Sequence, residues 1–294
     1  MADEPPRAPK AAKFPLRLDQ MAGGARSSRS GAAKAPVAPQ TLRPVAVASR
    51  EVLRPQRPLQ HAASESARRS VPTGLGLDSE GVRRQMSDRL RREGLRHEAV
   101  LDALATTPRH RFVDAALVTQ AYEDTSLPIG HGQTISKPSV VGRMIELLMA
   151  GASARAGGGL GRVMEIGTGC GYQAALLSLL ARQVLSIERI KPLHDKAREL
   201  LAPLHLRNVR LVYGDGMLGH PPDAPYDAII AAAGGDALPQ AWLDQLAVGG
   251  RLVAPLSDAN GRQSLLVVDR SERGFERGLH ETVQFVPLKS GVVR

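Results

Sequence analysis

Hydrophobic residues recur at helical spacing in three stretches of the chain. Met86 and Leu90 mark one face of the stretch 79–92, and the stretch 98–105 repeats the spacing. The stretch 139–149 carries its apolar residues in the same way and follows a proline that suits the first turn of a helix. The pattern therefore predicts three helices ahead of the main part of the chain.

Short apolar runs then alternate with helical patterns. Strands are predicted at 162–166, 184–187, 209–213, 227–231 and 251–255. Helices are predicted from a glycine-rich turn to about residue 181, over 192–201 and over 239–246. Two last strands, at 264–269 and 281–287, are expected to pair antiparallel. The alternation predicts an α/β fold, with a doubly wound and mostly parallel sheet that carries helices on both faces.

The first 75 residues lack any sustained period of 3.6 or 2.0. They hold 10 of the 21 prolines, and 13 lysines and arginines against five acidic residues. Such a segment cannot bury enough apolar surface to offset the entropy of ordering it. We therefore predict a disordered basic extension over 1–75 and one folded domain over 76–294.

The sequence does not determine the function of this extension. It could be a solvated tail without a specific partner, a weak electrostatic contact for nucleic acid or anionic lipid, or an organellar targeting segment. Nucleic-acid binding as the main activity is disfavoured, because the remaining 219 residues carry 26 basic and 24 acidic residues and are nearly neutral.

Composition excludes several classes of protein. The single cysteine, Cys170, excludes an internal disulfide framework and a cysteine-rich zinc site. No apolar run reaches the about 18 residues that a membrane span needs, and the eight histidines show no metal-ligand spacing. We therefore expect a cytoplasmic protein with no membrane partner and no metal.

A glycine-rich loop joins the first predicted strand to the helix after it. Gly167, Thr168, Gly169 and Gly171 form a G-x-G-x-G pattern, which differs from the G-x-G-x-x-G of dinucleotide-binding loops. Glu165 precedes the loop, and a carboxylate there would repel a pyrophosphate but attract an ammonium or sulfonium group. The alternative is a solvated charge at the end of a strand.

Two further acids end the next two strands. Glu188 is placed to accept hydrogen bonds from two ribose hydroxyls, and Asp215, followed by Gly216, from an adenine amino group. Three acids at successive strand ends beside such a loop favour a class I methyltransferase. The cofactor predicted is S-adenosyl-L-methionine, which carries an ammonium and a sulfonium but no phosphate.

Several segments of the chain resemble protein-L-isoaspartate O-methyltransferases over roughly residues 80–290. The resemblance is carried by Pro128–Pro138 (PIGHGQTISKP), Met164–Gln173 (MEIGTGCGYQ), Ser186–Arg189 and Tyr213–Gly216. The segment around Ser136 is the specific part, since other methyltransferases share only the glycine loop. The chain departs from the family pattern at Lys137, at Cys170 and over Ala233–Asp236.

The resemblance implies a Rossmann-like methyltransferase sheet and the following activity. A methyl group passes from S-adenosylmethionine to the free α-carboxylate of an isoaspartyl residue in a damaged protein, leaving S-adenosyl-L-homocysteine. The family's active-site position is Ser136, and Thr134 and Ile135 belong to the same substrate-binding segment. A carboxylate is already an anion at pH 7, so the reaction needs no general base.

The sequence leaves alternatives open for the role of Ser136 and for the function of the chain. The Ser136 hydroxyl could simply cap the helix that follows it. The chain could be a methyltransferase of the same fold that acts on RNA or a small molecule, a noncatalytic binding module, or, less favoured by the loop spacing, a nicotinamide oxidoreductase. The expected partners are isoaspartyl proteins and peptides without specific nucleic acid, and we expect a monomer.

Overall fold

A computed structural model describes residues 80–294 of the chain. The extension predicted over 1–75 lies outside these residues. All bounds and contacts below refer to the described part.

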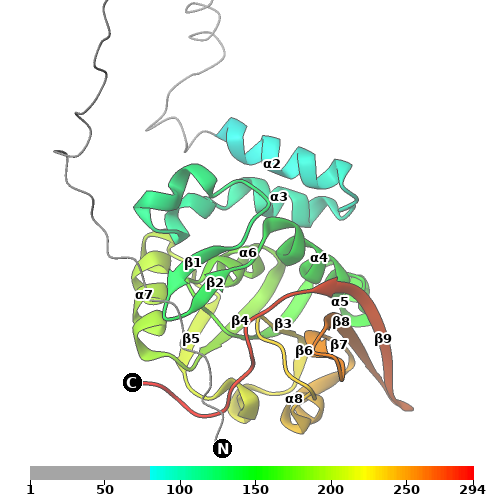
Figure 1. Cartoon of the computed structure of the whole chain (residues 1–294). Coiled ribbons are helices and arrows are strands. Elements are labelled where there is room, and N and C mark those ends of the chain that lie inside the picture. The colour runs from blue at the N-terminus through cyan, green and yellow to red at the C-terminus, as the bar shows by residue number, and fades with distance from the viewer. Residues whose placement is uncertain (1–79) are drawn as a thin grey trace, which may run out of the picture. The chain divides into compact units, whose positions relative to one another are not determined.

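A seven-stranded sheet forms the centre of this part (Figure 1). The strands follow the order β5-β4-β3-β6-β7-β8-β9, in which the first five are parallel and the last two join antiparallel. Their bounds are Leu160–Ile166 (β3), Ala181–Glu188 (β4), Val209–Tyr213 (β5), Tyr226–Ala231 (β6), Leu246–Ser257 (β7), Gln263–Ser271 (β8) and Gly274–Val283 (β9). The doubly wound sheet is thereby confirmed.

The order of the strands fixes where a ligand can bind. The chain runs outward from β3 through β4 to β5, and then returns to place β6 on the other side of β3. The connections after β3 and β6 therefore leave in opposite directions, and open a crevice at the carboxyl ends of these strands. The loop that follows Ile166 lies at this crevice.

Each face of the sheet is covered by its own hydrophobic core, because successive side chains of a strand point to opposite faces. In β3, Val163 belongs to one core and Met164 to the other. The first core packs against α2, α3, α4, α6 and α7, and the second against Trp242 and Leu243 of α8. The helices have the bounds Glu80–Arg92 (α2), Glu98–Thr106 (α3), Pro138–Met149 (α4), Ala152–Gly157 (α5), Tyr172–Leu180 (α6), Lys191–Leu201 (α7) and Gln240–Gln245 (α8).

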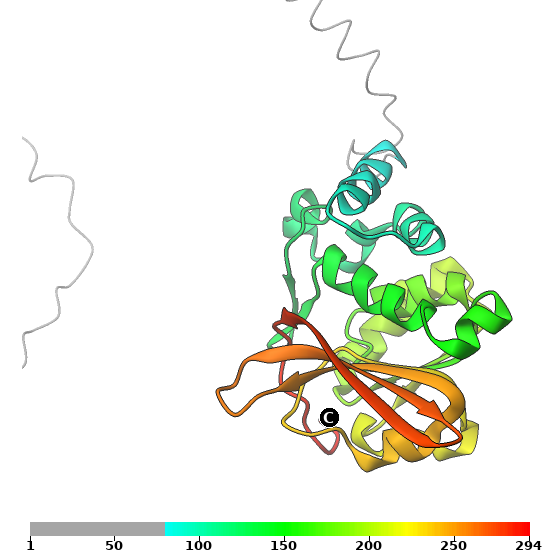
Figure 2. The same cartoon turned by 90° about the vertical axis from the view of Figure 1, so that its right-hand side faces the viewer.

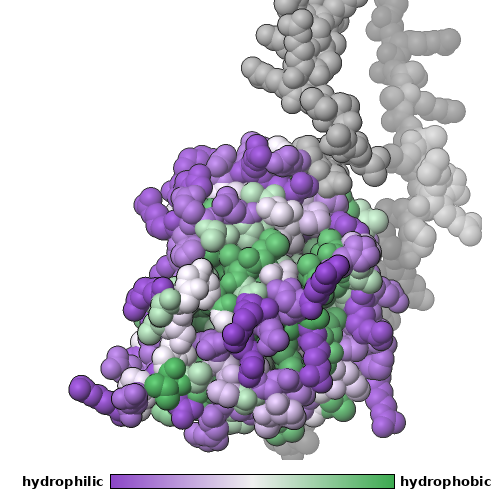
Figure 3. Space-filling model, turned by 180° about the vertical axis from the view of Figure 1, so that it is seen from behind, coloured by the Kyte–Doolittle hydropathy of each residue, from purple (hydrophilic) through white to green (hydrophobic). Residues whose placement is uncertain are grey.

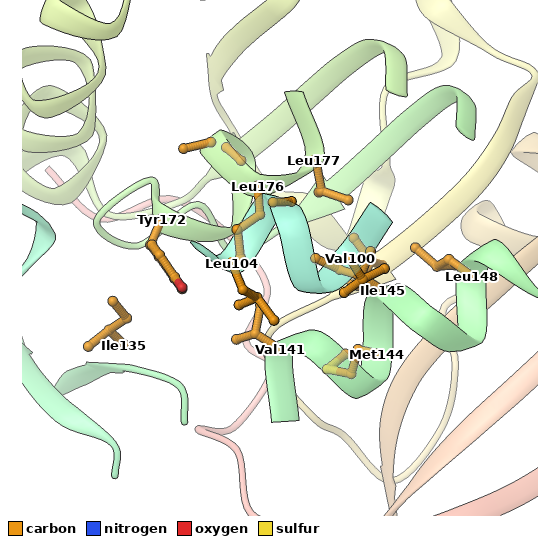
Figure 4. Close-up of a cluster of buried hydrophobic side chains, with 14 of the residues drawn as sticks. Val100, Leu104, Ile135, Val141, Met144, Ile145, Leu148, Tyr172, Leu176 and Leu177 are labelled. Carbon is orange, nitrogen blue, oxygen red and sulfur yellow. The ribbon is translucent and has the colours of Figure 1, made fainter. Parts of the chain in front are cut away.

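The three predicted leading helices are confirmed within about one residue. Helix α4 shows why the hydrophobic pattern predicted a helix. Its apolar residues recur every three or four positions and are all buried, namely Val141, Met144, Ile145 and Leu148. Figure 4 shows them packed with Val100 and Leu104 of α3 and with Leu176 and Leu177 of α6. Helix α4 is therefore part of the first core, and its amino end directly follows the segment around Ser136.

The predicted last strand at 281–287 is misplaced. Strand β9 begins at Gly274 and ends at Val283, and it forms a long twisted hairpin with β8 at the edge of the sheet (Figure 2). Most of its residues are exposed, so the alternation of apolar and polar residues that marks a half-buried strand is missing. Helix α6 also ends at Leu180, and β4 takes over at Ala181 without a loop.

The hairpin of β1 (Leu127–Gly130) and β2 (Gln133–Ile135) was not predicted, nor was α5. Two 3-10 helices, η2 (Arg109–Phe112) and η3 (Ala115–Gln120), connect α3 to this hairpin. These elements are too short to show a period of their own. The hairpin supplies one wall of the site described next.

Seen from behind, the surface is mainly hydrophilic around its border, with hydrophobic residues visible in the middle of the face (Figure 3). None of the helices within 80–294 combines the length and hydropathy required to cross a membrane.

Candidate active site

A cavity of about 480 Å³ lies at the carboxyl edge of the parallel strands. Its walls come from the β1–β2 hairpin, the glycine loop after β3, the ends of β4 and β6, and the C-terminal segment from Val286 to Val293. The predicted site residues that line it are Thr134, Ile135, Ser136, Gly167, Thr168, Gly169, Glu188 and Gly216. The other three, Glu165, Gly171 and Asp215, stand outside its lining.

The glycine loop turns sharply between β3 and α6. Gly167, Gly169 and Gly171 have φ angles of 90°, 56° and 91°, a region that side chains with a Cβ rarely adopt. A Cβ on Gly169 would also meet the Ile129 side chain at 3.1 Å. The loop therefore brings bare backbone to the cavity, which a bound ligand can approach closely.

Glu188 holds this loop in place. Its Oε2 accepts a hydrogen bond from the Gly169 N–H at 2.9 Å, and its Oε1 accepts one from the Ile190 N–H at 2.9 Å. The carboxylate is buried yet lines the cavity. Each oxygen has a further lone pair, so both remain able to accept a hydroxyl donor from a ligand.

Glu165 lies behind the cavity wall. It is fully buried, so the alternative of a solvated strand-end charge is wrong. Burial raises the pKa of Glu165 to about 8, and the hydrogen bond from Ser186 Oγ at 2.5 Å opposes the rise only in part. Ser186 Oγ also bonds to Thr168 Oγ1 at 2.5 Å. The acid is thus mainly protonated at pH 7, and it braces the loop through two hydroxyls instead of facing a ligand with a charge.

Asp215 follows β5 and begins a short 3-10 turn. Its Oδ1 accepts from the Met217 N–H at 2.9 Å, and its Oδ2 accepts from the Gly291 N–H at 2.5 Å. Gly216 does line the cavity, and Trp242 Nε1 donates to its carbonyl at 2.8 Å. The carboxylate of Asp215 is therefore engaged with backbone from both its own turn and the C-terminal segment.

The segment predicted to bind substrate forms the β1–β2 hairpin and its exit. Gly130, His131 and Gly132 all have positive φ angles, which produce a tight tip between β1 and β2. Thr134 is exposed on the hairpin, whereas the Ile135 side chain packs into the first core near Tyr172 (Figure 4).

Ser136 does not cap helix α4. The cap position is Lys137, which forms no side-chain capping bond, while Asp124 Oδ1 accepts from the Ser139 N–H at 2.8 Å and Asp124 Oδ2 accepts from Ser139 Oγ at 2.7 Å. The capping alternative for Ser136 is wrong because another residue caps this helix. The Ser136 hydroxyl is left available at the cavity wall.

Two departures from the family pattern lie in different surroundings. Lys137 is exposed and outside the cavity lining, whereas Cys170 lines the cavity and is buried. Burial raises the pKa of the Cys170 thiol to about 11, so it is not a thiolate nucleophile at pH 7. Gly234 lies in the third departing stretch, where its N–H donates to the Val286 carbonyl and its carbonyl accepts from the Leu288 N–H.

Three contributors to this site are absent from the sequence prediction. The C-terminal segment lines the cavity, although its Val286-Pro287-Leu288 only resembles the family and has no predicted role at the site. Tyr172 closes the glycine loop and lines the cavity with a buried ring. Arg109 is wholly buried, and its Nη2 donates to the Ser136 carbonyl at 2.7 Å. Over residues 80–294 there is no group of three or more histidines, cysteines and acids that could hold a metal ion.

Comparisons with known proteins identify the family of the chain. The family model described as protein-L-isoaspartate(D-aspartate) O-methyltransferase matches residues 82–293. A protein-L-isoaspartate O-methyltransferase of Methylibium petroleiphilum is 59% identical over 283 residues, which cover 96% of this chain and 97% of the relative. That of Leptothrix cholodnii is 64% identical over 241 residues, covering 81% and 84%.

Solved structures show the same fold. A protein-L-isoaspartate O-methyltransferase structure superposes with a TM-score of 0.63 at 26% identity, over 71% of this chain and 67% of the other. A Plasmodium falciparum chain solved in complex with S-adenosyl-L-homocysteine gives 0.59 at 23% identity, over 70% and 98%.

Proposed function

This chain belongs to the protein-L-isoaspartate(D-aspartate) O-methyltransferase family, and from that premise we propose how its cavity divides between methyl donor and acceptor. The enzyme is a methyltransferase that uses S-adenosylmethionine and acts on isoaspartyl residues in proteins. In our proposal the glycine loop and Glu188 hold the methyl donor, and the hairpin with Ser136 holds the acceptor.

The donor side fits S-adenosylmethionine in size and chemistry. The cavity of about 480 Å³ lies within the usual range for ligand sites of about 300–1,000 Å³. Glu188 offers two carboxylate oxygens to a ribose, and Gly167 and Gly169 offer close approach along the backbone. Thr168 and Gly216 complete this wall, while Glu165, Gly171 and Asp215 support it from outside the lining.

The acceptor side presents hydroxyls to an anion. Ser136 and Thr134 line the cavity on its hairpin side. A hydroxyl that donates to a carboxylate forms a charge-assisted hydrogen bond. When bound, S-adenosylmethionine supplies a methyl group on a sulfonium whose C–S electron pair stays on sulfur, so no proton has to move. The residues then need only hold one carboxylate oxygen in line with that methyl carbon, which is a task of positioning.

The observation that carries this proposal is that one cavity joins Ser136 on the hairpin to Glu188 at the end of β4. Labelled methyl transfer to a matched pair of peptides tests it, one with an isoaspartyl and one with an aspartyl residue. We expect labelling of the isoaspartyl peptide alone. Equal labelling of both peptides, or transfer to RNA in their place, contradicts it.

We also propose that the enzyme works as a monomer in the cytoplasm, without a specific nucleic-acid partner. The buried, unpaired Cys170 supports a reducing compartment, and the near-neutral charge of residues 76–294 offers little attraction to nucleic acid. Light scattering after size exclusion checks the monomeric state, and cell fractionation checks the cytoplasmic location.

A further inference from the structure

Arg109 is a fully buried cation behind the hairpin wall of the cavity. Its Nε donates to the Ala121 carbonyl at 2.8 Å, and its Nη2 donates to the Ser136 carbonyl at 2.7 Å and weakly to the Thr125 carbonyl at 3.4 Å. The guanidinium carbon lies 4.7 Å from the centroid of the Tyr172 ring. One side chain thus ties the exit of the hairpin to the first residue of α6.

No acidic side chain among residues 80–294 forms a salt bridge with this cation. Its Nη1 forms no hydrogen bond. The carboxylate of Asp124 bonds to Ser139 and acts on Arg109 only through its charge, from beyond contact distance. Burial lowers the pKa of Arg109, which the nearby Tyr172 opposes. Because an arginine loses its proton only far above neutral pH, the guanidinium remains charged.

A buried guanidinium without a salt bridge does not stabilise the fold. Removing a guanidinium from water carries a penalty that carbonyl groups and an aromatic face offset only in part, and an apolar side chain of similar volume avoids it. The positive charge is therefore better explained by what it does for its surroundings. Of the residues that Arg109 contacts, Ser136 and Tyr172 line the cavity.

We propose that Arg109 is a positioning residue for methyl transfer, which holds the Ser136 backbone against Tyr172 and whose positive charge, unpaired by any salt bridge, favours an anionic acceptor at Ser136. The proposal rests on the acceptor side described above, where a carboxylate binds at Ser136. Arg109 itself stays behind the wall and touches neither substrate.

The two effects of Arg109 act on different kinetic constants. The carboxylate loses its charge as it becomes a methyl ester, so a nearby cation stabilises the bound carboxylate more than the transition state. Loss of the charge should therefore raise KM for the peptide. Loss of the hydrogen bond to the Ser136 carbonyl should instead displace the hydroxyl that orients the carboxylate, and so reduce kcat.

Two variants separate these effects. Arg109→Met removes both the charge and the hydrogen bonds while it keeps an unbranched apolar side chain. Arg109→Lys keeps the charge but lacks the planar group that reaches two carbonyls and stacks on Tyr172. We expect Arg109→Met to raise KM about tenfold or more and to lower kcat, and Arg109→Lys to lower kcat with KM nearly unchanged.

The decisive measurement uses two peptides that differ in one group. One has an isoaspartyl residue with a free α-carboxylate, and the other has the same residue as its neutral α-carboxamide. Binding of each is measured by calorimetry on the full chain saturated with S-adenosyl-L-homocysteine. Arg109→Met should weaken binding of the carboxylate peptide about tenfold and leave that of the carboxamide peptide unchanged, and Arg109→Lys should preserve the preference for the carboxylate.

Arg251→Met is the matched control. Arg251 binds both carboxylate oxygens of Asp269 at 2.7 Å and the Leu147 carbonyl at 2.9 Å, outside the cavity lining. Its loss should lower the melting temperature without a change in peptide binding. Equal weakening of both peptides by Arg109→Met, or no change in either, overturns the proposed role of the charge.

Failure of this inference differs from failure of the proposed function. If the wild-type enzyme methylates isoaspartyl peptide selectively and Arg109→Met binds the two peptides as the wild type does, only the inference is wrong. If the wild type itself does not prefer the isoaspartyl peptide, the proposed acceptor site is wrong. Should Arg109→Met not fold, a normal kcat in Arg109→Lys overturns the positioning role, and a reduced kcat with unchanged KM supports it.

Discussion

The carboxylate of Asp215 accepts a hydrogen bond from the backbone N–H of Gly291 at 2.5 Å, and so links the end of β5 to the C-terminal segment. Arg189 reinforces this link, since its Nε donates to the Gly291 carbonyl at 2.9 Å and its own carbonyl accepts from the Val293 N–H at 2.8 Å. Val293 in turn lines the cavity. The C-terminal segment is thus held against the side of the cavity that we propose for the methyl donor, visible in Figure 1 as the red trace that returns toward α7.

Removal of residues 290–294 should weaken binding of S-adenosyl-L-homocysteine. The truncated chain loses Val293 from the cavity wall and the partners of both Asp215 and Arg189. At about 0.5–1.5 kcal/mol for each lost hydrogen bond, we expect affinity to fall about tenfold. Calorimetric titration checks this, with a chain that lacks only Arg294 as the control, and equal affinities of the two chains would contradict it.

Glu188→Ala should weaken binding of the methyl donor far more than binding of the peptide. Hydrogen bonds to a charged group contribute about 1.5–3 kcal/mol, which corresponds to a loss of roughly 10- to 150-fold. Because Glu188 also holds the Gly169 N–H, Glu188→Gln serves as a control that keeps an acceptor oxygen without the charge. Separate titrations with S-adenosyl-L-homocysteine and with peptide measure the effect, and parallel losses for both ligands count against the ribose role.

Ser136→Ala should reduce kcat/KM on isoaspartyl peptide by about 10- to 150-fold, since a charge-assisted hydrogen bond is lost beside the reacting carboxylate. The melting temperature should hardly change, because Ser136 does not cap α4. Asp124→Ala is the matched control, since it removes the side chain that does cap this helix and should cost about 1 kcal/mol of stability. A folded Ser136→Ala enzyme with near-normal kcat/KM would defeat the assignment.

Stability should fall as pH rises toward 8, because of Glu165. Its pKa is about 8 in the folded chain and near 4.5 in the unfolded chain, so the folded state binds one more proton between these values. The stabilisation from the neutral acid is complete below pH 4.5 and disappears as pH rises through 8, with a slope of up to about 1.4 kcal/mol per pH unit.

Denaturant unfolding of the wild type and of Glu165→Gln across pH 5–9 measures this slope. Glu165→Gln should flatten it, because the amide does not titrate. Glu146→Gln is the control, since hydrogen bonds from Arg96, Arg143 and His97 hold the pKa of Glu146 below its usual value, and its contribution lies at acidic pH. Parallel curves for the wild type and Glu165→Gln would show that Glu165 is ionised in the folded protein.

A chain that begins at Val71 should fold and keep its activity on short peptides. Residues 80–294 already contain both hydrophobic cores and every wall of the cavity. Cooperative thermal unfolding and the peptide assay measure the two properties on one preparation. Loss of either property would show that the first 70 residues contribute to the folded domain, against the predicted boundary.

The central α/β pattern could be predicted because its signals are local and repeated. Strands β3, β4, β6 and β7 contain buried apolar runs, and β5 is an apolar run that is partly buried. The loop between β3 and α6 needs glycines wherever φ is positive, as at Gly169. Strand β9 and the β1–β2 hairpin lack such a signal, since most residues of β9 face solvent and each hairpin strand is too short for a period.

By itself the sequence determined the parallel sheet, the glycine loop and the acids at successive strand ends, because residue type and spacing decide which segments can be strands and turns. Only the tertiary structure decided what these acids do. Burial raises the pKa of Glu165 to about 8, and the C-terminal segment donates a hydrogen bond to Asp215, while Glu188 alone of the three lines the cavity. Arg109 is the clearest example of this dependence on the fold. It contacts Ser136 and Tyr172, which lie 27 and 63 positions further along the chain. Desolvation and long-range contact set the charge and the place of a side chain, and both depend on neighbours that only the folded chain brings together.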